Sequence, residues 1–194
     1  MTKKNVAIFI YKDAEVLDFA GPFEVFSVTS ELQNFELYNV FTVSKKMEPV
    51  IAINGLSVNP TYSFKNAPPI DILIIAGGNG SRAQARDMKT LHWIKSVHHD
   101  TLYTASICSG SRLLGVLGLL DNHPYCTHKA VYDDMKIIVP SGTPQKELRF
   151  VNFGKIFTSG GISAGIDLSF HIVEKMHGNL IAQQTADYME YARR

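Results

Sequence analysis

The fold is indicated most clearly by the stretch Thr104-Ala105-Ser106-Ile107-Cys108-Ser109-Gly110-Ser111. A short apolar strand runs into a cysteine, and small residues that can open a helix follow at once. A sharp strand-to-helix turn crowds the backbone, and the alanine, serines and glycine on either side leave room for it. Partial positive charge at the start of the next helix favours a thiolate. Cys108 is therefore either a nucleophile on a strained turn or a small buried apolar residue.

Two other short apolar runs resemble the strand that precedes Cys108. They span residues 6–11 and 71–76, and each leads through a glycine-containing turn towards a helical stretch. Three successive strand, turn and helix units predict βαβ connections and a parallel sheet. Continuous apolar runs of this kind are typical of strands buried on both faces. The expected fold class is α/β.

Further elements are expected between and after these units. Strands are predicted at 35–43 and 50–58, the second interrupted by the turn signal Asn54-Gly55. A pair of short strands is predicted at 150–153 and 155–158. A long helix follows, with four apolar residues spaced by four along one buried stripe: Ala164, Leu168, Ile172 and Met176. A last helix is predicted at 180–192.

Length and charge limit the classes of function. The 194 residues suggest a single domain spanning 1–194. Nineteen basic and eighteen acidic residues leave a formal charge of +1, so no basic field for nucleic acid or anionic lipid is expected. Two cysteines are compatible with a reducing compartment. The first apolar run is too short for a signal peptide, and these features together predict a cytoplasmic protein.

Asp18 is an acid flanked by apolar residues after the first predicted strand. A helix is expected to begin near Pro22, where a missing backbone donor costs little, and Asp18 would then serve as its N-cap. The alternative is a partly desolvated carboxylate whose pKa is raised. Ligands of open parallel sheets bind beyond the carboxyl ends of the strands, and both Asp18 and Cys108 are expected at that edge.

A glycine-rich turn follows the strand at 71–76 and is expected at the same edge. Its Gly77, Gly78 and Gly80 can bring backbone donors to an anion or a developing oxyanion, or they simply make a tight turn. The turn lacks the Lys-Ser/Thr of a phosphate loop and the glycine spacing of a dinucleotide site.

His128 lies twenty residues after Cys108. It would orient or deprotonate the thiol, or it would only pack against the next helix. The group His123, Cys126 and His128 matches no zinc pattern, so no metal is expected. The basic group Arg82, Arg86 and Lys89 is expected to be solvated surface.

Several segments together resemble the ThiJ/PfpI superfamily, the class I glutamine amidotransferase-like proteins, over nearly the whole chain. Within it the chain is most similar to isonitrile hydratases and to the N-terminal domains of AraC-type regulators. The segments are residues 17–22, 76–80, 108–111, 114–120, 127–128 and 158–167. The resemblance implies a flavodoxin-like three-layer sandwich with a mostly parallel sheet, a small-molecule substrate, a homodimer and no cofactor.

The resemblance also implies roles for individual residues. Cys108 would attack an isonitrile carbon as a thiolate, Asp18 would transfer protons, and water would release an N-substituted formamide. Backbone groups near Gly78 and Ser109 would hold the attacked centre. Ser109 stands where those hydratases usually have threonine, so the hydroxyl is kept.

Three alternatives to a hydratase follow from the same residues. The spacing of Cys108 and His128 resembles that of the glyoxalase and deglycase branch, although that branch generally has a glutamate where this chain has the shorter Asp18. A cysteine redox sensor or a non-catalytic ligand sensor would use the same turn. A DNA-binding regulator would need a further module, for which a chain ending at Arg194 is expected to have no room.

Overall fold

The computed structural model describes residues 2–193 and has a seven-stranded sheet at its centre. The strands of this sheet are β1 (Lys4–Phe9), β2 (Tyr38–Ser44), β5 (Tyr62–Ser63), β6 (Ile72–Ile75), β7 (Tyr103–Ser106), β10 (Phe150–Phe153) and β11 (Ile156–Ser159). Their order is β10-β11-β7-β6-β1-β2-β5. Only β10 runs antiparallel to its neighbour. The predicted α/β class with a mostly parallel sheet is confirmed.

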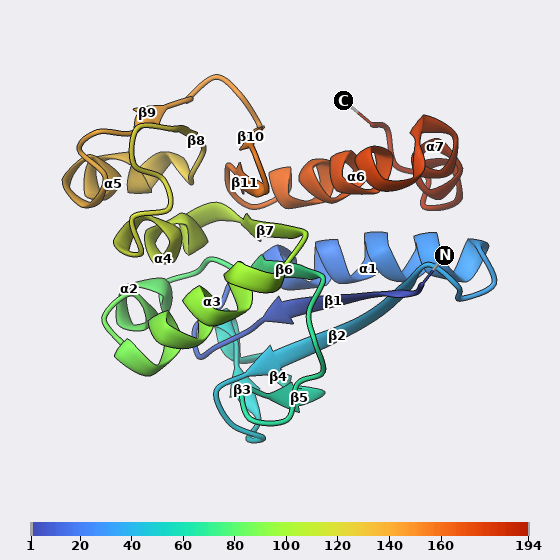
Figure 1. Cartoon of the computed structure of the whole chain (residues 1–194), viewed down its shortest axis with the longest axis horizontal. Helices are drawn as coiled ribbons and strands as arrows, with labels where there is room; N and C mark the ends of the chain where they lie inside the picture. Colours follow the sequence, from blue (N-terminus) through green and yellow to red (C-terminus); the bar gives the residue numbers. More distant parts are fainter. Residues whose placement is uncertain (1, 194) are drawn as a thin grey trace.

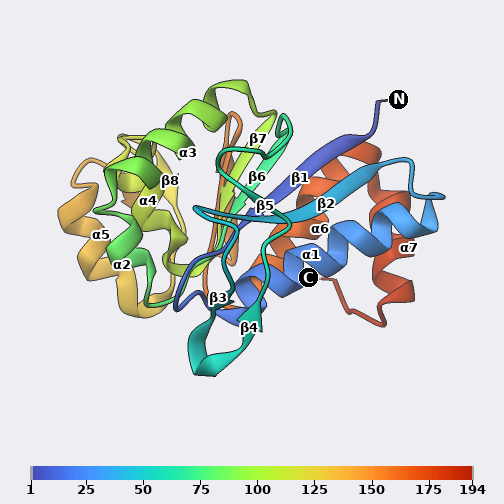
Figure 2. The same cartoon turned by 90° about the horizontal axis from the view of Figure 1, so that it is seen from below.

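Helices cover both faces of the sheet. They are α1 (Val16–Leu32), α2 (Ser81–Gln84), α3 (Met88–Asp100), α4 (Ser111–Val116), α5 (Tyr132–Ile138), α6 (Ala164–His177) and α7 (Asn179–Tyr188). Figures 1 and 2 show α1, α6 and α7 together on one side and α2 to α5 on the other. The result is the three-layer sandwich that the strand and helix alternation predicts.

Short elements complete the chain. Residues 50–58 form two strands, β3 (Val50–Ile51) and β4 (Ser57–Val58), which pair antiparallel around η1 (Ile53–Gly55). Asn54 and Gly55 both have positive φ, as the turn signal predicts. The remaining short elements are η2 (Cys108–Gly110), β8 (Pro124–Tyr125), η3 (Lys129–Val131) and β9 (Thr143–Pro144).

The core consists of the central strands and the inner faces of the helices. All four residues of β6 are buried, and so are the last four of β1. Burying apolar strands on both faces is the main favourable contribution to folding, at about 25 cal/mol per Å² of apolar surface. On α6, Ala164, Leu168 and Ile172 are buried and Met176 is half-buried against the core, as their spacing predicts.

The first helix begins earlier than the sequence suggested. α1 starts at Val16, so Pro22 lies inside it and Asp18 lies in its first turn. Glu15 occupies the N-cap position and makes no side-chain cap. The prediction of a helix starting near Pro22 was therefore wrong, and so was the N-cap alternative for Asp18. Proline tolerates helical φ, and the apolar residues around it bury one face of the helix, which outweighs one lost backbone hydrogen bond.

Within residues 2–193, no helix is both long enough and apolar enough to cross a membrane.

Candidate active site

The carboxyl ends of four parallel strands bring the predicted site residues to one edge. β6 ends at Ile75 before the glycine turn, β7 ends at Ser106 before Cys108, and Ile75 and Ser106 are aligned. The Ile107 N–H continues the pairing by donating to Ile75 O at 3.0 Å. The sheet register thus sets Cys108 beside the glycine turn, as the rule for parallel sheets predicts.

Cys108 lies on a strained turn. Its φ of 54° is in the left-handed region, which non-glycine residues rarely adopt and which is commonest at functional sites. Its N–H donates to Gly160 O at 3.2 Å, which ties the turn to the end of β11. A Cβ on Gly110 would stand 2.6 Å from Ile75 O, so the turn has no space for a larger residue there. The predicted need for small neighbours agrees with this packing.

Asp18, which lies on α1, contacts the glycine turn beside Cys108. Its Oδ2 accepts the Gly77 N–H at 3.0 Å, while its Oδ1 is buried and has no hydrogen-bond partner within the described chain. The position is fixed because the Glu15 N–H donates to Gly77 O at 3.0 Å and the Gly80 N–H donates to Asp13 O at 3.2 Å. Two backbone links therefore join the start of α1 to the glycine turn.

Asp18 and Cys108 lie on either side of the space above Gly77, and each shifts the pKa of the other. Burial raises the pKa of Asp18 to about 7, although the Gly77 N–H and the Cys108 side chain oppose the shift. Burial, followed by the charge of Asp18, raises the pKa of the Cys108 thiol to about 12. The backbone and hydroxyl of Ser109 oppose that rise but do not overcome it. At neutral pH the protein thus holds a thiol beside a carboxyl that can gain or lose a proton.

The pKa of Cys108 corrects one expectation from the sequence. The turn was expected to favour the thiolate, yet the thiol pKa is raised. Two physical reasons account for this: the sulfur is desolvated, and the charge that acts on it most strongly is that of an acid, Asp18. The helix that follows the turn, α4, is also only six residues long. Activation of Cys108 would therefore require a base.

Ser109 is held by the glycine turn. Its Oγ accepts the Gly78 N–H and donates to Gly78 O, both at 2.9 Å, and it also accepts the Ser81 hydroxyl at 3.1 Å. The Ser109 hydroxyl thus bonds to the backbone of the turn beside the cysteine. Its single proton is committed to Gly78 O in the ligand-free chain.

The amides of the three predicted glycines are already paired. The Gly77 N–H donates to Asp18, the Gly78 N–H to Ser109 Oγ, and the Gly80 N–H to Asp13 O. Because each amide has one proton, a substrate would have to displace a partner to use any of them. The more direct donor is the Ser109 N–H, which interacts with the Cys108 sulfur.

His128 lies on the wall of the Cys108 cavity. Its Nδ1 accepts the Ala130 N–H at 3.2 Å, and its ring packs so closely on Gly161 that a Cβ there would stand 2.2 Å from Cδ2. The same Cβ would stand 3.2 Å from the Cys108 sulfur. The ring and the sulfur thus face the same side of Gly161, although no hydrogen bond joins His128 to Cys108 within residues 2–193.

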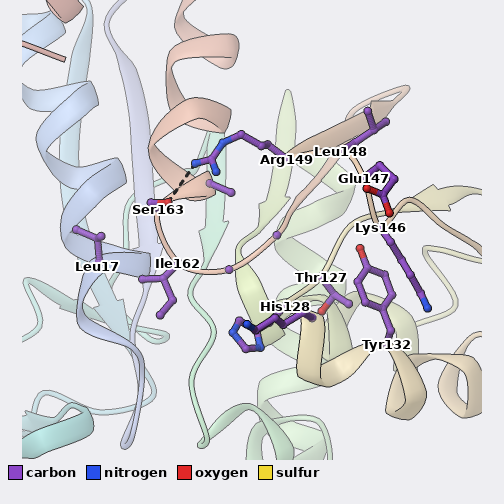
Figure 3. Close-up of a pocket in the computed structure, with 14 residues that line it drawn as sticks. Leu17, Thr127, His128, Tyr132, Lys146, Glu147, Leu148, Arg149, Ile162 and Ser163 are labelled. Atoms are coloured by element: carbon purple, nitrogen blue, oxygen red, sulfur yellow. Dashed lines mark hydrogen bonds between the residues drawn. The ribbon is translucent and has the colours of Figure 1, made fainter. Parts of the chain in front are cut away.

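Two adjoining cavities meet at this edge. The smaller, about 190 Å³, contains Cys108 and Ser109. The larger, about 540 Å³, is shown in Figure 3 and lies between the start of α1, the turn at 160–164 and the start of α5. His128 and Ile162 line both cavities. In Figure 3, Leu17 and Ile162 face Tyr132 across the space, and Arg149 donates to Ser163 Oγ at 3.1 Å.

Two residues at this site were not predicted from the sequence. Arg112 is 4% exposed yet lines the Cys108 cavity. The signal was a charged residue directly before Leu113-Leu114, where a buried apolar side chain would be expected. Gly161 lies in the stretch 158–167 that carries the resemblance, and its contact with both His128 and Cys108 appears only when the chain is folded.

Metal-binding clusters are absent from the part of the chain that the structure describes: it holds no group of three or more His, Cys, Asp or Glu side chains arranged for a metal. Cys126 is fully buried and donates through its sulfur to Gln145 O at 3.4 Å and Leu148 O at 3.6 Å. Both cysteines are free.

Comparison with known proteins places these observations in a family. The chain is 32% identical over 188 residues to an isonitrile hydratase of Pseudomonas putida, covering 97% of this chain and 78% of the relative. It is 25% identical over 191 residues to the HTH-type transcriptional regulator GbdR of Pseudomonas aeruginosa, of which it spans 51%. The chain thus covers about half the length of that regulator.

Solved structures and a family model agree with these similarities. A ThiJ/PfpI family protein from Pseudomonas syringae superposes with a TM-score of 0.88 at 27% identity, covering 100% of this chain and 77% of that one. The DJ-1/PfpI family model matches residues 4–175. The chain therefore belongs to the DJ-1/PfpI family.

Proposed function

We propose that this protein is a cysteine-dependent hydratase or hydrolase of small carbon-nitrogen compounds, with isonitrile hydration as its reaction type. The placement of Asp18 and Cys108 against the same point, where a Cβ on Gly77 would stand 2.7 Å from Asp18 Oδ2 and 2.8 Å from Cys108 Cβ, carries the proposal. An attacking thiol must lose a proton that the substrate carbon later gains, and a carboxyl with a pKa of about 7 is suited to both transfers at neutral pH. The similarity to an isonitrile hydratase over 97% of the chain supports it.

The first step joins the substrate to the enzyme. The Cys108 S–H bond breaks, its proton passes to Asp18, and the sulfur forms a bond to the isonitrile carbon. Asp18 then gives that proton to the same carbon, which leaves a neutral thioimidate, R–N=CH–S–Cys108. The Ser109 N–H beside the sulfur stabilises the negative charge while it is present.

The second step releases the product with water. Water adds through oxygen to the thioimidate carbon, one of its protons passes to nitrogen, and the carbon–sulfur bond breaks. The other proton returns to sulfur, so the products are an N-substituted formamide and the original thiol. Asp18 again carries protons, and no oxidant or reductant is required.

The two cavities divide the substrate between them in this proposal. The reacting group occupies the 190 Å³ space at Cys108, and its substituent extends past His128 and Ile162 into the 540 Å³ space. His128 would then line the path to the substituent and support the site without taking the thiol proton.

The test is incubation with a simple aliphatic isonitrile and detection of the formamide. We expect turnover by the wild-type chain, none by Cys108→Ala, and turnover like that of the wild type by Cys126→Ser. The Cys126→Ser variant is the matched control because the hydroxyl can donate to the same carbonyls. Absence of formamide from the wild type, or turnover by Cys108→Ala, would contradict the proposal.

The second candidate is a non-catalytic ligand sensor, which the similarity to regulators over 98% of the chain favours. It predicts that a small molecule binds in the Cys108 cavity and is recovered unchanged. A peroxide sensor has less support, because the thiolate is the reactive form and the raised pKa of Cys108 disfavours it. Glyoxalase-like chemistry, tested with methylglyoxal, has less support because no hydrogen bond joins His128 to Cys108 within residues 2–193.

The proposal includes the cellular compartment and the oligomeric state of the enzyme. We place it in the cytoplasm, where its two free cysteines stay reduced, and we expect a homodimer that acts on a small molecule. Light scattering of the purified chain tests the dimer directly.

A further inference from the structure

A cavity of about 300 Å³ adjoins the Cys108 cavity, and Arg82 and Arg112 line both of them. We call it the arginine cavity. It opens among α2, α4 and α5, which lie together in both Figure 1 and Figure 2. Its charged lining residues are Arg82, Arg86, Arg112 and Asp134, and its apolar lining includes Val116 and Ile137.

Positive charge predominates in the arginine cavity. The single carboxylate, on Asp134, accepts through the same Oδ2 from Arg82 at 3.2 Å and from Arg112. The third guanidinium, on Arg86, is exposed and forms no ion pair within residues 2–193. Three guanidinium groups thus face one acid, and an anion in the cavity would offset part or all of the remaining positive charge.

Arg112 makes this arrangement unusual. Its side chain is only 5% exposed, whereas that of its counter-ion Asp134 is 41% exposed. A buried charge is costly unless well paired, and a half-exposed carboxylate shared with Arg82 is a weak partner. Arg112 also lines both the arginine cavity and the Cys108 cavity. A ligand that binds Arg112 on one side therefore acts on a residue at the active site.

We propose that the arginine cavity binds a small organic oxyanion, a carboxylate or a phosphate monoester with a short apolar body, and that its occupancy alters the reactivity of Cys108. The guanidinium groups would take the oxyanion, since their planar donors match carboxylate and phosphate oxygens. The apolar body would cover Val116 and Ile137, residues that are 45% and 83% exposed.

A chain of hydrogen bonds leads from the arginine cavity to the cysteine. Arg112 Nη1 donates to Ser81 Oγ at 2.9 Å, and Ser81 Oγ donates to Ser109 Oγ at 3.1 Å. Ser109 in turn donates to Gly78 O. Each hydroxyl has one proton, so every donor in the chain points from Arg112 towards the glycine turn. An anion that draws Arg112 away weakens the first bond and frees the hydroxyls beside Cys108 to reorient.

Binding is tested by titration calorimetry at low salt with benzoate, phenyl phosphate, inorganic phosphate and the neutral benzamide. We expect the two aromatic anions to bind, more weakly as salt is added. The tighter of the two identifies a carboxylate or a phosphate monoester as the preferred class. If benzamide bound as tightly as benzoate, the proposal that the guanidinium groups recognise a negative charge would be wrong. If inorganic phosphate bound as tightly as phenyl phosphate, the proposal that Val116 and Ile137 contact an apolar body would be wrong.

A substitution of Arg86 shows which cavity the anion occupies, because Arg86 lines the arginine cavity and does not line the Cys108 cavity. Arg86→Gln should weaken binding of the aromatic anions at least about threefold. The matched control is Lys95→Gln, which removes the same charge from an exposed position on α3 outside both cavities. Equal affinities of the two variants would place the anion elsewhere and overturn the proposal.

Coupling is tested without turnover, so its result is independent of the proposed hydratase activity. The rate at which iodoacetamide alkylates Cys108 is measured with and without saturating phenyl phosphate. We expect at least a twofold change in the wild-type chain and none in Ser81→Ala, which removes the hydroxyl between Arg112 and Ser109. An unchanged rate in the wild type, or the same change in Ser81→Ala, would overturn the coupling.

Discussion

The Gly77 N–H donates to Asp18 Oδ2 at 3.0 Å and so holds a buried carboxylate against the turn that carries Cys108. Glycine is the only residue type that fits at position 77, between Asp18 and Cys108. A Cβ at this position would stand 2.7 Å from Asp18 Oδ2 and 2.8 Å from Cys108 Cβ. The glycine thus allows an acid on a helix and a thiol on a neighbouring turn to share one desolvated space.

This packing predicts the effect of adding a methyl group. Gly77→Ala should lose turnover and about 1–3 kcal/mol of unfolding free energy, because the added carbon would also stand 2.6 Å from Ser109 N. The control is Gly160→Ala at the same edge, where the nearest atom would be 3.6 Å away. Urea unfolding and formamide assays on both variants check the prediction, and similar losses in the two would contradict it.

Asp18→Asn separates proton transfer from thiol ionisation. The amide oxygen can still accept from Gly77, but the proton carrier is lost, so turnover should fall at least about 10²-fold. The negative charge that helps to raise the pKa of Cys108 is also lost, so iodoacetamide should alkylate Cys108 faster at pH 8. Asp133→Asn, at an exposed position, should change neither rate. Parallel changes in the two rates would count against the assigned role of Asp18.

The raised pKa of Asp18 predicts a pH dependence of stability. The carboxyl has a pKa of about 7 in the folded chain against an ordinary value of 3.8, so between these values the unfolded chain loses the proton first. Stability should therefore fall as pH rises from about 4 to 7 and then level off, by up to about 4 kcal/mol. Asp18→Asn should lack this component. Urea unfolding of both proteins at pH 4, 5.5 and 8 measures the difference, and parallel curves would refute the shift.

Ser109 offers a test of the hydroxyl at the turn. Ser109→Ala would leave the Gly78 N–H and the Ser81 hydroxyl without their acceptor, which should lower the unfolding free energy by about 1–3 kcal/mol. Alkylation of Cys108 should also slow in this variant, because it lacks the hydroxyl that can turn from Gly78 O to the ionised sulfur and lower the pKa of the thiol. Ser109→Thr keeps the hydroxyl and should restore both quantities. Equal effects of alanine and threonine would show that the hydroxyl has no such role.

The sequence by itself determined the fold class and the edge of the sheet at which Asp18, the glycine turn and Cys108 lie. Apolar runs bounded by glycine turns specify strands of a parallel sheet, and a parallel sheet brings its carboxyl ends to one edge. The elements containing Asp18, Gly77 and Cys108 are therefore placed together by the sequence alone. These inferences depend on periodicity and connectivity, which are local properties of the chain.

Only the tertiary structure decided how the site residues are paired and charged. Asp18 proved to lie inside α1 because the helix is set by burial of its apolar face and not by Pro22. The raised pKa of Cys108 and the burial of Arg112 depend on desolvation and on partners far away in the sequence. Such quantities arise from the surroundings of an atom in three dimensions, and sequence spacing does not encode them.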